Sequence, residues 1–180
     1  MHRSYWPVTV AAQRVVAAAA PEGGAVGVPA VHRWRHAVGV TVEGMFSTEI
    51  EVRTGDTPAV YDLTRDIERF LVAATARDGL LHVWVPHATA GLAVIETGSG
   101  SDDDLLAAID LLLPRDDRWQ HRHGSRGHGR DHVLPAFVPP FVSVPVIDGT
   151  LATGTWQSVC LVDTNVDNHT RRVRFSFLAG

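Results

Sequence analysis

Alternating and continuous apolar patterns predict regular structure from Met45 onward. Between Phe46 and Val52, apolar and polar positions alternate with the period of two that a half-buried strand shows. A continuous apolar run over residues 80–85 predicts a buried strand, and residues 92–95 predict its neighbour. Further strands are predicted over residues 142–146, 155–162 and 173–177.

Two helices are predicted between these strands. Thr64 is a helix-capping residue type, and apolar residues recur at helical spacing from there to about Ala76, shortly before Gly79. A second helix is predicted from Ser101 to Pro114. Three aspartates occupy its first turn, where the helix dipole favours negative charge.

The chain divides into one domain and an extension. Asp148-Gly149 predicts a β-hairpin, and short turns of this kind imply antiparallel strands. The order of elements therefore predicts a single α+β domain over residues 45–180, with its helices on one side of an antiparallel sheet. Residues 1–44 lack a helical or strand period and contain Ala-rich and Gly-rich stretches. We expect a flexible extension there; an arm that docks on a partner subunit is the alternative.

Composition and charge narrow the classes of function. The 180 residues suit one globular domain, and a net charge of −4 argues against nucleic acid as a partner. The sequence contains no Lys, which excludes Schiff-base and phosphate-loop lysines. The single Cys160 excludes an intrachain disulfide and suits a reducing compartment. No apolar run is long enough to span a membrane, and Gln13 and Arg14 interrupt the best candidate for a secretory signal, so a cytoplasmic protein is expected.

Histidine is concentrated around a long polar segment. Six of the ten histidines lie within residues 82–132. Residues 115–131 offer almost nothing to bury, and loops of this length in a compact domain are usually functional or mobile. His121 and His132 bracket this loop. His123 and His128, in its middle, are expected to be solvated.

Polar residues at the ends of predicted strands are a second signal. His87 follows the strand at residues 80–85, and Glu96 ends the next one, so a hairpin of these strands would place both side chains on one rim. Neither spacing is a zinc signature by itself. Trp156 and Gln157 are either a buried indole with a nearby amide or a pair that orients a ligand, and composition does not separate these two interpretations.

Several short motifs follow one another along the chain with near-constant spacing. They are His87-Ala88-Thr89-Ala90, Glu96, Trp119-Gln120-His121, His132, Asp148-Gly149, Gly154-Thr155-Trp156-Gln157 and Arg171-Arg172-Val173. Taken in this order, they resemble the YjbQ family, and the resemblance covers residues from about 46 to 180. It implies an antiparallel α+β sandwich, a homotrimer with its sites near subunit boundaries, and a secondary thiamine-phosphate synthase activity.

The resemblance also implies roles for individual residues. The sequence departs from the family pattern at three places. Thr97 stands where Asn is usual, Asp163 stands where Glu is usual, and residues 167–171 stand where an Asp-Gly-Pro-Arg motif is usual. By position, the implied metal ligands are His87, His121 and His132, the catalytic carboxylates are Glu96 and Asp104, and the substrate-binding residues are Thr89, Trp156, Gln157 and Arg171.

The implied reaction joins hydroxymethylpyrimidine diphosphate to a thiazole phosphate and releases pyrophosphate, so a divalent metal and Arg side chains suit the leaving group. Carboxylates favour magnesium whereas three imidazoles favour zinc, and the metal stays open between them. This mismatch indicates that the activity is secondary to an unknown principal reaction. Two alternatives remain: a metal-dependent hydrolase or lyase of a small phosphorylated metabolite, and a trimeric metal- or metabolite-binding protein without catalysis.

Overall fold

The structure is a computed structural model that describes residues 33–34 and 44–180. The expected extension over residues 1–44 thus lies almost wholly outside the described residues. Within the described part of the chain, no helix is long and apolar enough to cross a membrane. In chain order the elements are β1 (Arg33–Trp34), β2 (Met45–Arg53), β3 (Ala59–Asp62), α1 (Thr64–Ala73), β4 (Gly79–Trp84), β5 (Ala90–Ile95), α2 (Ser101–Leu112), α3 (His128–Asp131), the 3-10 turn η1 (Leu134–Ala136), β6 (Phe141–Ile147), β7 (Thr150–Leu151), β8 (Ser158–Asp163) and β9 (Thr170–Ala179).

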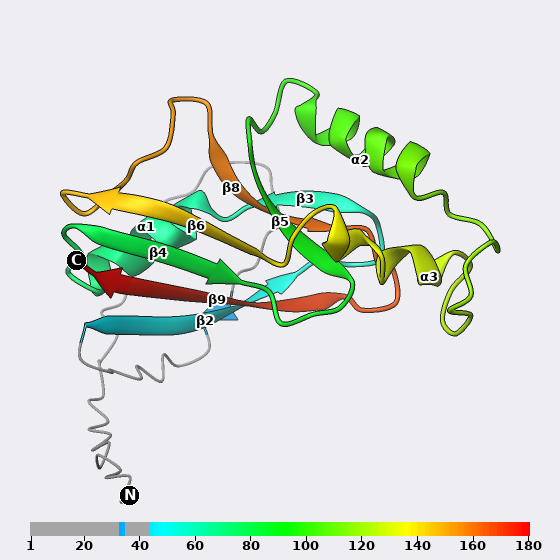
Figure 1. Cartoon of the computed structure of the whole chain (residues 1–180), viewed down its shortest axis with the longest axis horizontal. Helices are drawn as coiled ribbons and strands as arrows, with labels where there is room; N and C mark the ends of the chain where they lie inside the picture. The colour runs from blue at the N-terminus through cyan, green and yellow to red at the C-terminus, as the bar shows by residue number, and fades with distance from the viewer. Residues whose placement is uncertain (1–32, 35–43) are drawn as a thin grey trace, which may run out of the picture.

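Two antiparallel sheets form the framework (Figure 1). The larger has the order β1-β2-β9-β4-β6-β7, and the smaller has the order β3-β8-β5. The longest pairing joins β2 to β9, from Met45 opposite Leu178 to Arg53 opposite Thr170. Every pairing among the described strands is antiparallel, which confirms the predicted α+β fold with antiparallel strands.

The apolar positions of alternating strands build a layered core. The inner face of the larger sheet packs against α1 and the smaller sheet, with Phe175, Leu81 and Leu161 all completely buried. A second cluster, which includes Ile109 of α2 and Val162 of β8, covers the other face of the smaller sheet. The two main helices therefore lie on opposite faces of the smaller sheet. The expectation that they share one side is wrong, because β8 is apolar on both faces and both need cover.

The predicted hairpin between residues 80–85 and 92–95 does not form. β4 pairs with β6 and β9 in the larger sheet, whereas β5 pairs with β8 in the smaller one. The short connection between β4 and β5 thus crosses from one sheet to the other. The apolar run over residues 80–85 predicts a buried strand, but only one face of β4 is buried, because Leu80 and Trp84 on the other face are each 40% exposed. The run also does not identify the pairing partner.

Turn chemistry explains where other elements begin and end. Asp148 (φ 50°) and Gly149 (φ 77°) join β6 to β7 as the predicted hairpin turn, and both have the left-handed backbone that a two-residue turn of this kind requires. At Gly149 a Cβ would lie 2.8 Å from the Ala76 carbonyl oxygen. β8 begins at Ser158 rather than at 155, because the Gln157 side chain accepts the Gly154 N–H at 2.8 Å and closes a turn there.

A buried ion pair joins the two sheets at one end of the sandwich. Asp163 ends β8 and Arg171 lies in β9, and each side chain is 1% exposed. The guanidinium donates two hydrogen bonds to the carboxylate, at 2.7 and 2.9 Å. Arg171, expected to bind substrate, is therefore committed to a structural contact within the chain.

Arg171→Met should destabilise the protein because it leaves the Asp163 carboxylate buried without its partner, a change that costs about 3–5 kcal/mol. Urea unfolding measures this loss. Arg172→Met is the matched control: the neighbouring guanidinium is 60% exposed and lies 3.6 Å from Glu49, so its loss should change stability by less than about 1 kcal/mol. Equal unfolding midpoints for the two variants would contradict the assigned role.

Candidate metal centre

Four histidines converge on one point beside α3. One ring nitrogen from each of His121, His123, His128 and His132 lies within 4.8 Å of the other three. Neighbouring ring centres are 4.1 to 4.9 Å apart around this group, and the two diagonal distances are 5.7 and 5.9 Å. We call this arrangement the histidine ring. Four imidazole nitrogens this close together could hold one metal ion.

Local sequence builds half of the ring. His128 begins α3 and His132 follows it, so their four-residue spacing places both on one side of the helix. Their Nε2 atoms are 3.0 Å apart. His121 reaches the same place because its backbone lies against α3, where a Cβ on Gly129 would stand 2.6 Å from the His121 carbonyl oxygen. Glycine at this position allows the loop to close onto the helix.

A buried network of hydrogen bonds holds α3 in place. The Asp131 carboxylate is fully buried and accepts hydrogen bonds from the Thr164 hydroxyl at 2.7 Å and the Asn165 side-chain amide at 3.1 Å. Arg130, 1% exposed, donates to the Leu113 carbonyl oxygen at 3.0 Å. These contacts connect α3 to the end of α2 and to the segment that follows β8.

Two members of the ring, His121 and His132, favour the neutral imidazole. Partial loss of hydration, followed by the proximity of the other ring histidines, lowers the pKa of His121 and His132 below 6.5. The pKa of Asp167, beside His128, is also below its usual value, because the Ser125 backbone N–H donates to it and the His128 and Ser125 side chains add further hydrogen bonds. Neutral imidazole is the form that binds a metal.

The structure brings together two of the three predicted metal ligands. His121 and His132 both belong to the ring. The expectation that His128 is solvated is wrong, since its side chain is buried at 8% exposure, and His123, although exposed, is also a ring member. The four-residue spacing of His128 and His132 was the signal that sequence reasoning missed.

The third predicted ligand, His87, lies outside the ring. It is half-buried, and its Nε2 accepts the Arg172 backbone N–H at 2.9 Å, which occupies a lone pair that a metal would need. Burial, followed by the nearby charges of Arg171 and Arg172, lowers its pKa. Thr89, two residues later, is buried at 8% exposure.

The remaining predicted residues gather at the opposite end of β5 and β8. Ala90, near His87, pairs with Asp163, whereas Ile95, next to Glu96, pairs with Ser158. A strand of this length spans about 17 Å or more, so the expectation that His87 and Glu96 share one rim is wrong.

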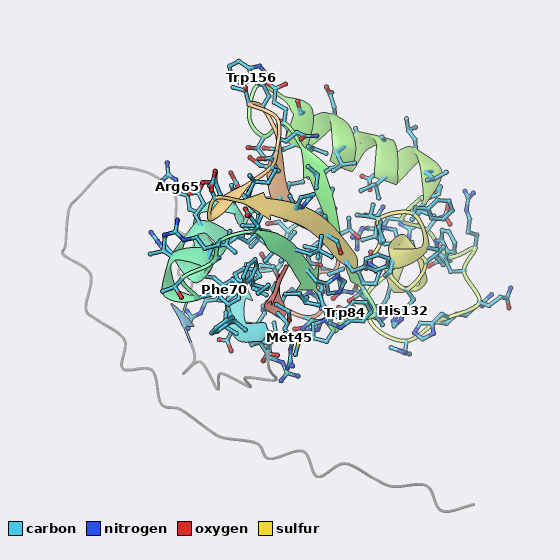
Figure 2. All side chains as sticks on the ribbon, turned by 60° about the vertical axis from the view of Figure 1, so that its left-hand side comes forward. Met45, Arg65, Phe70, Trp84, His132 and Trp156 are labelled. Atoms are coloured by element: carbon cyan, nitrogen blue, oxygen red, sulfur yellow. The ribbon has the colours of Figure 1, made fainter. Side chains whose placement is uncertain are left out.

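At this second end, which we call the carboxylate end, four predicted residues are all exposed. Figure 2 shows Trp156, 73% exposed, at the tip of the loop before β8, far from His132. Gln157 follows it and holds the turn at Gly154. Asp104 lies in the first turn of α2, which begins shortly after β5 ends. The residues of the carboxylate end are Glu96, Asp104, Trp156 and Gln157.

Comparison with known proteins agrees with the motif resemblance. Residues 48–180 match the family described as UPF0047 protein YjbQ-like. A UPF0047 protein of Mycobacterium tuberculosis is 58% identical over 121 residues, which make up 67% of this chain and 92% of that protein. A UPF0047 protein of Archaeoglobus fulgidus is 32% identical over 126 residues, or 69% and 95% of the two chains. The chain belongs to the YjbQ-like UPF0047 family.

Solved structures confirm the family fold. A YbjQ-like protein of unknown function from Sulfolobus solfataricus superimposes with a TM-score of 0.71 at 24% identity, covering 76% of this chain and 98% of that chain. A hypothetical protein from Aeropyrum pernix gives a TM-score of 0.69 at 28% identity, with coverages of 74% and 98%. These likenesses establish the fold, and the chemistry of this YjbQ-like protein is argued from its site.

The lowered histidine pKa values predict how stability depends on pH. Because His121 and His132 have folded-state pKa values below 6.5, the unfolded chain binds more protons as the pH drops past that value. The contribution of these two histidines to folding stability is fully present above about pH 6.5. It is lost as the pH falls through their pKa values in the folded protein. The Tm of metal-free protein should therefore fall from about pH 7 to about pH 5.5, and less steeply in a His121→Gln/His132→Gln variant. An identical slope in the double variant would contradict this assignment.

Proposed function

We propose that the histidine ring binds one divalent transition-metal ion, with zinc as the best match, and that the protein acts on a small phosphorylated molecule there. The convergence of four imidazoles carries this proposal. Imidazole suits zinc, whereas magnesium prefers oxygen ligands. Among the described residues, the group of four ring nitrogens contains no carboxylate. The donor set therefore supports zinc over magnesium.

The spacing of one pair of ring nitrogens matches that of two zinc ligands. Zinc binds imidazole nitrogen at about 2.0–2.1 Å in tetrahedral geometry, which sets two such nitrogens about 3.3 Å apart. The Nε2 atoms of His128 and His132 are 3.0 Å apart. Three ring members, His121, His123 and His132, are exposed, so the ion would be accessible from solvent. When bound, such an ion supplies a Lewis acid for a phosphoryl or carbonyl oxygen.

A pocket beside the ring supports a small anionic ligand. Its volume is about 270 Å³, and Trp119, Arg122 and Arg126 contribute to its lining along with His121 and His123. Arg126 already lies 3.6 Å from Asp117. Arg122 is exposed and makes no ion pair with any described residue, so its guanidinium is free to bind a phosphate.

Thiamine-phosphate synthesis is a second candidate, supported by the grouping of Glu96, Trp156 and Gln157 at the carboxylate end. These residues are separated from the ring within one chain by the length of β5. They would meet a ring only across a subunit boundary, as the homotrimer of the resemblance would allow. In this arrangement the ring of one subunit and the carboxylate end of another face one substrate.

Metal titration tests the ring directly. Metal-free protein should bind Zn²⁺ or Co²⁺ at one ion per chain by calorimetry, and His128→Ala should weaken binding at least ~10-fold because one imidazole donor is lost. The control is His82→Ala, since His82 contacts Ser143 on the larger sheet and is not in the ring. Tight Mg²⁺ binding that His128→Ala leaves unchanged would contradict a zinc site in the ring.

Turnover separates the candidate functions. Zinc-loaded protein should convert a small phosphorylated substrate, and Arg122→Ala should raise KM with little change in kcat if the guanidinium binds phosphate equally throughout the reaction. The control is Arg53→Ala, which removes an exposed Arg from β2, outside the pocket, and should leave KM unchanged.

With the two thiamine-phosphate precursors as substrates, Glu96→Gln should lower turnover by ~10²-fold if the carboxylate end completes the site. Unchanged turnover in that variant would remove Glu96 from the site. Tight zinc binding without turnover of any phosphorylated compound would favour the non-catalytic binding protein.

A further inference from the structure

Asp167 contacts the histidine ring from a distant part of the chain. Its Oδ2 lies 2.5 Å from Nδ1 of His128, a separation of 39 positions in sequence. The Asp167 side chain is 33% exposed, and the His128 side chain is 10% exposed. The contact therefore sits at the boundary between the core and the pocket, on the side of His128 that faces away from the ring.

This contact decides which nitrogen of His128 carries the hydrogen. A carboxylate has no proton near neutral pH, so a 2.5 Å contact requires a hydrogen on Nδ1 of the imidazole. The Asn165 amide nitrogen is also 3.2 Å from Nδ1, and it donates to Asp131 at 3.1 Å. The shorter contact decides the tautomer, because the Asp167 carboxylate has no hydrogen to donate, whereas the amide does not need Nδ1 as an acceptor. Neutral His128 with a hydrogen on Nδ1 has its free lone pair on Nε2.

The free lone pair of His128 points into the ring. Its Nε2 is the atom that lies 3.0 Å from Nε2 of His132. Asp167 thus orients a lone pair toward the centre where the other histidine nitrogens converge. Ligating histidines are commonly held in this way, because a carboxylate on the second nitrogen fixes the tautomer and the ring orientation and raises the basicity of the ligand.

Asp167 also fastens the loop that carries His121 and His123. The same Oδ2 accepts the Ser125 backbone N–H at 3.0 Å and the Ser125 hydroxyl at 3.1 Å. The position of Asp167 is itself fixed, since its backbone N–H donates to the Asn165 side-chain oxygen at 3.1 Å. One carboxylate oxygen therefore connects α3, the loop before it and the segment after β8.

We propose that Asp167 is a positioning residue for the metal site, so that the segment after β8 forms part of a centre whose ligands all lie in residues 121–132. The inference rests on the proposed metal binding by the ring. It assigns Asp167 no contact with the metal: its carboxylate acts through Nδ1 of His128 and through Ser125.

Co²⁺ titration of full-length variants, followed by absorption spectroscopy, tests this role. Asp167→Ala should weaken Co²⁺ binding by ~10–100-fold. Asp167→Asn, which keeps one oxygen acceptor but no charge, should fall between that variant and the natural protein. Asp117→Ala removes one negative charge from the rim of the same pocket without touching a histidine. It should weaken Co²⁺ binding by less than ~3-fold, the effect of a screened surface charge.

A second readout needs no metal. Two-bond ¹H–¹⁵N spectra of metal-free protein should show His128 with its hydrogen on Nδ1, and Asp167→Ala should produce a mixture of both tautomers. Natural affinity for Co²⁺ in Asp167→Ala, with weakened binding in His128→Ala, would overturn the inference while leaving the ring as a metal site. Failure of the natural protein to bind Zn²⁺ or Co²⁺ would overturn both proposals.

Discussion

The buried carboxylate of Asp131 is the interaction on which the rest of the candidate site depends. It is fully buried, and Thr164 and Asn165 from the segment after β8 donate to it. A buried charge without such donors costs several kcal/mol, so α3 and that segment must meet wherever Asp131 is buried. Because His128 and His132 flank Asp131 on one short helix, this requirement also sets two corners of the histidine ring.

The crossing of the chain between β4 and β5 determines where the other predicted site residues lie. It sends the chain from the larger sheet to the smaller one, so His87 stays near the end where Asp163 and Arg171 pair, while Glu96 is carried to the other end. His87 and Glu96 are therefore close in sequence but lie at opposite ends of β5. A site that uses both groups must be assembled from more than one chain, whereas the histidine ring is complete within one.

The sequence predicts the framework well and the site only in part. Periods of two and of 3.6 residues identify β2, α1, α2 and β9, and Asp148-Gly149 identifies a hairpin, because these signals are local. The pairing of β5 with β8 is a tertiary choice that an apolar run does not encode. The role of Asp167 is still less visible, since it arises from a contact across 39 positions, and Asp167 lies in a segment where the sequence departs from the family motif. His123 and His128 lie in a stretch of polar composition, which is why composition alone suggests solvation, although His128 begins α3.

The stability of the fold does not explain why the four histidines of the ring lie together. Its members His121, His123 and His132 are exposed, so bringing their rings together buries little apolar surface. Holding these side chains in one arrangement costs conformational entropy. Lost hydration and mutual proximity also lower the pKa of two of them, which disfavours their charged forms and costs stability in acid. A local arrangement that opposes stability, yet is supported by a buried Asp131 network and by Asp167, is typical of a functional site rather than of a core. A bound metal ion would turn the same proximity of lone pairs into a stabilising contact, because binding to the folded state alone adds to its stability.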